Sequence, residues 1–239
     1  MISKELNSNN AIVLCGHGSR NSNYILEFVR LKEKLEKKID FDFYSCFIEI
    51  NKPSIKDCIV RIIKEYDKIF FFPLLLFEGK HLIKDINKEI STLTYKYKEK
   101  IHFINKLSLT DDIFPSMKKV LNKKDFRQFD TLVTSCSFSK SNKVIEELEA
   151  YTNELSNNLK FKNHFFYYVG DEKKLFEELN KKNNISKKIL LHPIFFFDGY
   201  LYQKSINVLS KSFSTSKLLP LSNYQFTIDI ISKKLVSRI

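Results

Sequence analysis

The sequence IFFFPLLLFEGKHLIKDI at residues 69–86 returns in altered form as ILLHPIFFFDGYLYQKSI at residues 189–206. Pro73, Gly79 and Ile86 each have an identical partner 120 residues later. Each copy is an apolar run followed by a more polar stretch, as in a buried strand that leads into a helix. The chain therefore contains an internal duplication, and we expect its two halves to share one fold.

Short apolar runs alternate with amphipathic segments along the rest of the chain, a pattern typical of parallel sheets covered by helices on both faces. The polar, basic segment NKKDFRQF at residues 122–129 is the expected linker. We predict an α/β fold with two similar domains, residues 1–123 and 124–239, each a small parallel sheet flanked by helices, with a cleft between them. The expected strands lie at residues 11–15, 41–50, 68–77 and 101–107, then at 131–135, 165–169, 187–197 and near Leu218.

Composition supports a folded protein of this size. The 239 residues are 43% apolar and include 22 Phe and 11 Tyr, enough to build a core in each half. No apolar run approaches the roughly 20 residues of a membrane-spanning helix, and the start MISKELNSNN has no apolar signal region. The four cysteines form no CxxC motif and no iron–sulfur signature, so we expect reduced, buried thiols in a cytoplasmic protein.

The formal charge of +12 comes from 40 basic and 28 acidic residues. Such an excess is compatible with nucleic acid, an anionic membrane or an acidic small molecule as partner. It is equally compatible with a compositional bias that scatters lysines over solvated faces, because only five of the basic residues are Arg. Since the chain has no dense basic block and no RNA-binding signature, we expect neither a nucleic-acid nor a membrane partner.

Three ionisable residues stand at equal intervals: His17, Glu49 and His81, each 32 residues from the next. A strand, its helix and the return strand take about 30 residues, so each residue is expected at the carboxyl end of a successive strand. Parallel strands bring these ends to one edge of the sheet, where α/β proteins bind ligands. Two imidazoles and a carboxylate there predict a divalent-metal site with open positions, better suited to Co, Fe or Ni than to Mg.

Each of the three residues also has a simpler interpretation. His17 alone could form a hydrogen bond within its turn, His81 could be a first-turn helix residue, and Glu49 could be a carboxylate at a helix N-terminus. The common spacing favours a shared site, because a chance arrangement has no reason to repeat at the period of the strands. The glycines that flank His17 favour it too, since they let the backbone approach a ligand.

Three motifs, GHGSR (16–20), FIEINKPSI (47–55) and PLLLFEGKHLIKDI (73–86), resemble those of the sirohydrochlorin chelatases, the class II family that inserts cobalt or iron into sirohydrochlorin. The resemblance covers nearly the whole chain in fold and repeat, and its specific motifs lie in the first half. It implies a two-domain metal chelatase, a lyase that serves cobalamin or sirohaem biosynthesis. The divalent metal (Co²⁺ or Fe²⁺, with Ni²⁺ as a further candidate) is then a substrate, and no organic cofactor or iron–sulfur cluster is expected.

The resemblance also implies roles for individual residues. His17 and His81 bind the metal, His17 also accepts a proton, and Glu49 is the assisting carboxylate at the metal. Neutral imidazole suits both tasks, because its pKa lies close to neutral pH. The family's substrate loop contacts the acidic macrocycle partly through main-chain amides. The substrate-binding residues expected from the family are Arg20, Leu75, Leu76, Phe77, Glu78, Gly79 and Lys80.

The two halves are chemically unequal. The segments 14–23 and 134–142 correspond at an offset of 119, which places Cys136 at the position of His17. His192 is expected to be a core or strand-end residue. We therefore predict one metal site, with the second half as the opposing wall of the cleft. A non-catalytic tetrapyrrole or metal carrier that kept the fold is the alternative. The oligomeric state stays open.

Overall fold

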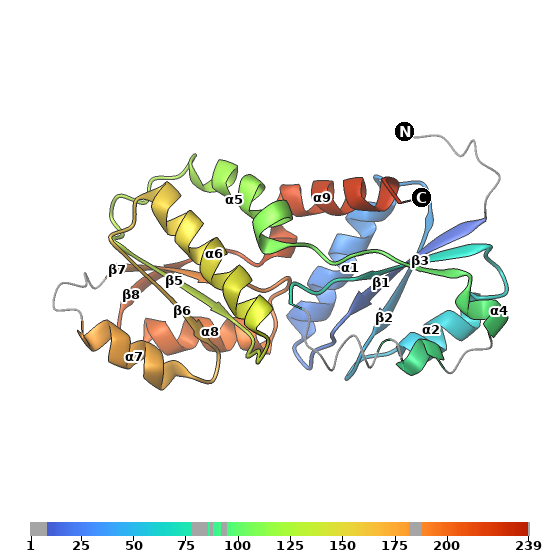
Figure 1. Cartoon of the computed structure of the whole chain (residues 1–239), viewed down its shortest axis with the longest axis horizontal. Helices are drawn as coiled ribbons and strands as arrows, with labels where there is room; N and C mark the ends of the chain where they lie inside the picture. Colours follow the sequence, from blue (N-terminus) through green and yellow to red (C-terminus); the bar gives the residue numbers. More distant parts are fainter. Residues whose placement is uncertain (1–8, 78–85, 87, 92–94, 182–187, 239) are drawn as a thin grey trace. The chain divides into compact units, whose positions relative to one another are not determined.

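The protein is an α/β protein with two four-stranded sheets, in which every strand pair is parallel (Figure 1). The predicted fold class is confirmed, apart from the expected cleft between the halves, which stays a prediction. The computed structural model describes residues 9–77, 86, 88–91, 95–181 and 188–238.

The first sheet has the strand order β2-β1-β3-β4, with β1 and β3 in the middle. All seven residues of β1 are buried, as expected for a central strand covered on both faces. The elements that share one compact unit with this sheet, its own strands included, are β1 (Asn10–Gly16), α1 (Ser22–Glu36), β2 (Asp42–Phe47), α2 (Ile55–Ile62), β3 (Lys68–Pro73), α4 (Tyr95–Lys98), β4 (Ile101–Phe103) and α9 (Gln225–Val236).

The second sheet repeats this order as β6-β5-β7-β8. The two sheets have the same strand order because the sequence is duplicated, so each strand of the second sheet has a counterpart in the first. The elements of this half are η1 (Leu109–Ile113), α5 (Phe114–Leu121), β5 (Thr131–Cys136), α6 (Asn142–Leu159), β6 (Asn163–Tyr168), α7 (Glu172–Lys181), β7 (Lys188–Pro193), α8 (Tyr200–Ser210), β8 (Ser214–Lys217) and η2 (Leu221–Asn223).

The chain divides into two compact units, which differ from the expected domains 1–123 and 124–239. Unit 1 is Met1–Leu107 with Gln225–Ile239, and unit 2 is Ser108–Tyr224. Helix α9 belongs to unit 1 because it packs against α1. Segment 108–123 belongs to unit 2, because η1 and α5 pack against α6.

Specific contacts hold these two segments in place. In unit 1, Lys38 at the end of α1 forms an ion pair with Asp229 of α9. In unit 2, Glu147 of α6 accepts a hydrogen bond from the backbone N–H of Leu109 at 2.8 Å. The apolar periodicity of a helix shows that one face is buried, but it does not identify the sheet that buries it.

Matching hydrogen bonds in the two halves determine how the repeat aligns. They link the end of the third strand to the first strand, and they close the turn that precedes the first helix. Each bond recurs 120 residues later. The pairs are Leu74 N to Cys15 O (2.8 Å) with Ile194 N to Ser135 O (2.7 Å), and Asn21 N to Ser19 Oγ (3.1 Å) with Ser141 N to Ser139 Oγ (3.1 Å).

The expected offset of 119 at this turn is therefore wrong by one residue. With an offset of 120, Ser137 stands at the position of His17, and Cys136 takes the place of Gly16. Few residues of this turn are identical in the two halves, so the sequence alone does not determine the offset.

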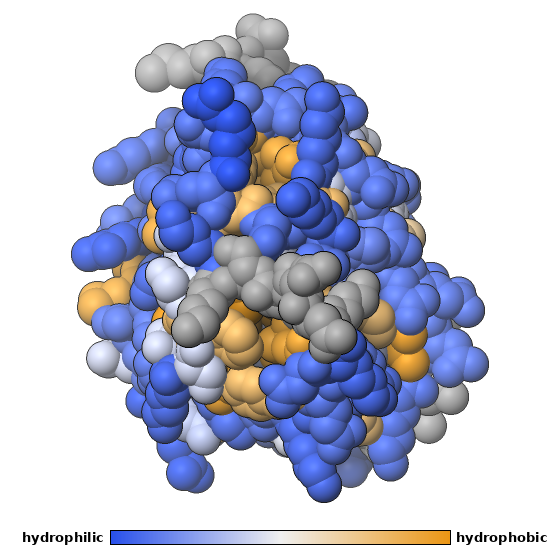
Figure 2. Space-filling view, turned by 90° about the vertical axis from the view of Figure 1, so that its left-hand side faces the viewer, coloured by the Kyte–Doolittle hydropathy of each residue, from blue (hydrophilic) through white to orange (hydrophobic). Residues whose placement is uncertain are grey.

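Buried and exposed residues follow the expectations from composition. All four cysteines are buried free thiols, and no helix of the described residues is long and apolar enough to cross a membrane. The side of the molecule shown in Figure 2 carries mainly hydrophilic residues, with apolar side chains visible between them in smaller groups.

Candidate active site

His17 directly follows the last residue of β1, at the C-terminal edge of the sheet in unit 1. The turn that carries it packs closely against α1. A Cβ atom at Gly16 would lie 2.8 Å from the Tyr24 hydroxyl and 2.9 Å from Cε2 of Phe28. A side chain at this position would push the turn away from the helix. Glycine therefore allows the turn that carries His17 to lie close to α1.

Gly18, on the other side of His17, brings the turn against the loop that follows β2. Its φ is +104°, and a Cβ atom there would lie 2.0 Å from the carbonyl oxygen of Glu49. The two loops also share a backbone hydrogen bond, in which Glu49 N donates to His17 O at 3.0 Å. The glycine therefore permits a contact between the two main chains that no L residue would allow.

Asn51 holds the second loop in position. Its backbone N–H donates to the carbonyl oxygen of Glu49 at 2.7 Å, which closes a tight turn around Ile50, whose φ is +68°. A positive φ is rare and costly for a β-branched residue, so neighbouring contacts must maintain it. The side-chain oxygen of Asn51 supplies one such contact, because it accepts a hydrogen bond from Ser19 N at 2.7 Å.

The two loops bring the predicted histidine and carboxylate together. His17 Nδ1 lies 3.3 Å from Glu49 Oε1, and the two side chains are 49% and 57% exposed. A carboxylate beside Nδ1 favours the tautomer with the proton on that nitrogen. The lone pair of Nε2 is then available to bind a metal ion or to accept a proton.

The remaining predicted residues fall into two groups. Arg20 is exposed in the same turn as His17, whereas Leu75 and Phe77 after β3 are half-buried and Leu76 is buried. Leu75 packs against the core of unit 1, so its contacts are with the protein interior. The other predicted residues, Glu78, Gly79, Lys80 and His81, lie outside the described residues.

Among the described residues, no group of three or more His, Cys, Asp or Glu side chains is arranged to hold a metal ion. The structure brings together His17 and Glu49, and His81, the third expected ligand, is not among the residues it describes. Asn51 is a positioning residue that the sequence analysis missed. The signal was present, because Asn51 follows Ser19 by 32 residues, the same interval that separates Glu49 from His17.

Comparison with known proteins gives a family match for the first half of the chain. Residues 11–124, from β1 through the end of α5, match the family model described as CbiX. The first half of the chain is therefore similar to the CbiX family. The resemblance that the three sequence motifs indicated is thereby confirmed. Among curated proteins, no sequence matches this chain at a significant level.

Solved structures with the same fold match nearly the whole of this chain. SirB from Bacillus subtilis with Fe³⁺ is 18% identical, with a TM-score of 0.75 over 96% of this chain and 95% of that one. SirB from Bacillus subtilis subspecies spizizenii in complex with cobalt is 16% identical, with a TM-score of 0.73 over 96% and 94%. CbiX, described as the terminal enzyme for biosynthesis of siroheme in denitrifying bacteria, is 9% identical, with a TM-score of 0.68 over 96% and 99%.

Unit 2 has other residues at the corresponding edge of its sheet. Ser137 stands at the position of His17, and Phe138, which replaces Gly18, is 63% exposed. The Phe138 ring meets that of Tyr168 edge to face, with 5.5 Å between centroids. The imidazole of unit 1 is therefore not repeated here, in keeping with the expected inequality of the halves.

His192 in β7 is a core residue, as the sequence analysis expected. Its side chain is fully buried, and Nε2 lies 2.8 Å from the Tyr151 hydroxyl. Burial disfavours the charged imidazolium and lowers the pKa of His192 to about 3. The residue is therefore neutral near pH 7 and contributes to the core of unit 2.

Proposed function

We propose that the protein is a sirohydrochlorin chelatase, which inserts a divalent metal ion, cobalt or iron, into sirohydrochlorin. The observation that carries the proposal is the 3.3 Å contact between His17 and Glu49 at the ends of two parallel strands. Both residues lie within the segment 11–124 that matches the CbiX family. A cytoplasmic role in sirohaem or cobalamin biosynthesis follows from the same proposal.

The reaction requires a group that holds the metal and accepts protons. Insertion of a divalent metal into a tetrapyrrole displaces two protons from pyrrole N–H groups. His17 Nε2 would bind the ion and accept a proton, since neutral imidazole does both near neutral pH. Glu49 would hold the ring by Nδ1 and offset the positive charge, and His81 would be the second imidazole at the metal.

Basic side chains near His17 would bind the substrate. Sirohydrochlorin, as the family implies it, carries eight carboxylates, so Arg20 and Lys80 would contribute charge-assisted hydrogen bonds. The loop 75–80 would hold the macrocycle through main-chain amides, which agrees with the burial of Leu76. Unit 2 would carry no second metal site of this kind, because Ser137 stands at the position of His17.

The choice of metal belongs to the proposal as well. Imidazole and carboxylate ligands suit first-row transition metals, and delivery in the cell often decides among them. The related SirB structures contain Fe³⁺ and cobalt, which supports these two metals as candidates. Anaerobic insertion into sirohydrochlorin with Co²⁺, Fe²⁺ and Ni²⁺ in turn, followed by product absorbance, would test the activity and rank the ions.

The histidine assignment has a matched control in the other unit. His17→Ala should lower the insertion rate at least ~10²-fold, the lower range for loss of a general base. His164→Ala removes an exposed imidazole from β6 and should leave the rate unchanged. Near-normal insertion by folded His17→Ala protein would contradict the proposed role. Tight binding of sirohydrochlorin and metal without turnover in the wild type would favour the carrier alternative.

A further inference from the structure

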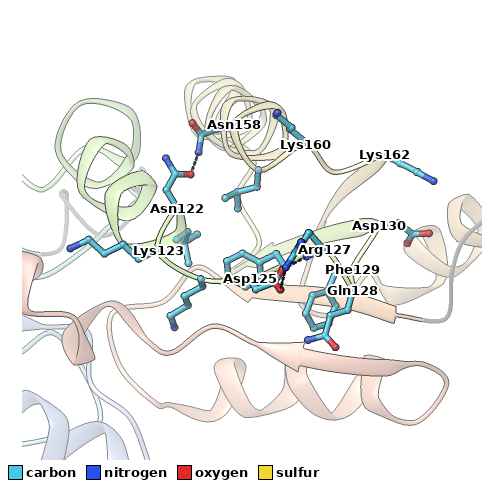
Figure 3. A pocket seen from close by; sticks show the side chains of 14 residues that line it. Asn122, Lys123, Asp125, Arg127, Gln128, Phe129, Asp130, Asn158, Lys160 and Lys162 are labelled. Carbon is cyan, nitrogen blue, oxygen red and sulfur yellow. Dashed lines mark hydrogen bonds and ion pairs between the residues drawn. The ribbon is translucent and has the colours of Figure 1, made fainter.

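A surface pocket of about 880 Å³ opens in unit 2. It lies between the end of α5, the segment that leads into β5, and the connection from α6 to β6 (Figure 3). Residues 121–130, 158–160 and 162 line it. Because β5 and β6 begin here, the pocket occupies the N-terminal edge of the second sheet.

Backbone and side-chain contacts give this pocket a defined shape. Asn158 Nδ2 donates to Asn122 Oδ1 at 2.8 Å, which ties the end of α6 to the end of α5. Lys162 N donates to Asp130 O at 2.9 Å, so the two segments that enter the sheet are also joined. Lys160 caps α6 with a φ of +58°, a left-handed conformation that turns the chain back toward β6. Segment 122–130, which forms one wall of the pocket, is therefore hydrogen-bonded at its two ends, to the end of α6 and to the α6–β6 connection.

The lining carries an excess of positive charge. Five basic and two acidic residues line it, and Arg127 is already paired with Asp125 through bonds of 3.0 and 2.9 Å. That pairing lowers the pKa of Asp125 to about 2. Within the described part of the chain, no ion pair neutralises the other basic residues, which are Lys123, Lys124, Lys160 and Lys162.

Aromatic surface accompanies this charge. The rings of Phe126 and Phe129 are half-buried and lie 6.3 Å apart, and Leu159 adds a half-buried aliphatic side chain. Figure 3 shows Phe129 and Arg127 near the middle of the pocket, with Lys160 at its margin. Ring faces and a guanidinium stack on planar groups, whereas the surrounding ammonium groups attract phosphates or carboxylates.

We propose that this pocket binds a small aromatic polyanion, a planar molecule with two or more phosphate or carboxylate groups. The planar part contacts Phe126 and Phe129, and the anionic groups lie among the lysines. Segment 122–129, which the sequence analysis interpreted only as a linker, then forms one wall of a ligand site. This binding site is separate from the proposed chelatase reaction, because none of its lining residues belongs to the His17 and Glu49 loops.

A trinitrophenyl analogue of ATP tests the proposal, because it is an aromatic polyanion whose fluorescence rises on binding. The wild-type protein should bind it, and unlabelled ATP should displace it better than pyrophosphate or adenosine. Pyrophosphate offers only the anion and adenosine only the planar group. Displacement by pyrophosphate as effective as displacement by ATP would overturn the aromatic part of the proposal.

Two charge variants of equal net charge provide the control. Lys124→Gln/Lys160→Gln should raise the Kd at least about fivefold, as expected for two solvent-exposed charge contacts. Lys173→Gln/Lys174→Gln changes two lysines of α7 outside the pocket lining and should alter the Kd less than about twofold. Equal effects of the two double variants would overturn the proposal that the probe binds in this pocket, and would indicate only general attraction to a basic protein.

Phe126→Leu separates ring stacking from apolar volume. It should raise the Kd about fivefold or more, the lower range for loss of one aromatic stacking partner. Thermal unfolding of each variant verifies the fold, and His17→Ala should bind the probe as the wild type does. An unchanged Kd for folded Phe126→Leu, or loss of binding in His17→Ala, would contradict the proposed site.

Discussion

Gly18→Ala is the most direct perturbation of the candidate site. The added Cβ atom would lie 2.0 Å from Glu49 O, 3.0 Å from Glu49 C and 3.2 Å from Asn51 Oδ1. Two of these three are backbone atoms, which do not rotate away as a side chain would. We therefore expect the loops that carry His17 and Glu49 to separate, which would break their contact at 3.3 Å.

The magnitude follows from the bonds that the separation removes. A left-handed backbone costs an L residue roughly 1–2 kcal/mol. Glu49 N to His17 O and Ser19 N to Asn51 Oδ1 are lost as well, at about 1 kcal/mol each. The free energy of unfolding of unit 1 should therefore fall by about 3–4 kcal/mol. The rate of metal insertion should fall with it, because the imidazole loses its carboxylate.

Gly170→Ala is a matched control for backbone strain. Gly170 has a φ of +113°, and a Cβ atom there would meet nothing within 4 Å. The difference between the two variants should therefore be about 2 kcal/mol, the contribution of the two hydrogen bonds. Urea unfolding followed by circular dichroism measures the loss, and amide hydrogen exchange at Ser19 and Glu49 locates it. If Gly18→Ala is no less stable than Gly170→Ala and keeps protected amides, the loops do not pack as described.

Burial of neutral His192 predicts a pH dependence of stability, because its folded pKa of about 3 is below the unfolded value of about 6.5. As pH falls through this window, the unfolded state binds a proton that the folded state does not, so the free energy of unfolding decreases. His192→Gln should make this decrease smaller, which urea unfolding at several pH values between 6 and 4 would measure. Glu49→Gln keeps the shape of the side chain but removes its charge, and it should weaken Co²⁺ binding about tenfold or more. A Co²⁺ affinity equal to that of the wild type would count against a role of Glu49 at the metal. Salt should raise KM for sirohydrochlorin more than it lowers kcat, since charges are screened within about 10 Å at 0.1 M. Arg20→Gln should raise KM and reduce that salt dependence, and the same slope as in the wild type would show that Arg20 does not bind the carboxylates.

The sequence by itself determined the fold class and the repeat. Continuous apolar runs such as 11–15 indicate strands buried on both faces, and the partners spaced by 120 residues reveal two copies of one fold. It also placed His17 and Glu49 at one edge, because their interval equals the period of successive parallel strands. These predictions depend on periodicity, which the order of residues along the chain records directly.

The tertiary structure alone decided which segments complete each unit and how the site is held. Helix α9 packs in unit 1 although it follows unit 2 in the chain, because burial of an apolar face does not specify its partner. The role of Asn51 depends on a side-chain bond to a backbone N–H in another loop, and the polar segment 122–129 forms a pocket through its contact with the end of α6. Both are contacts between residues distant in the sequence, and their geometry is set by loops that have no periodic pattern.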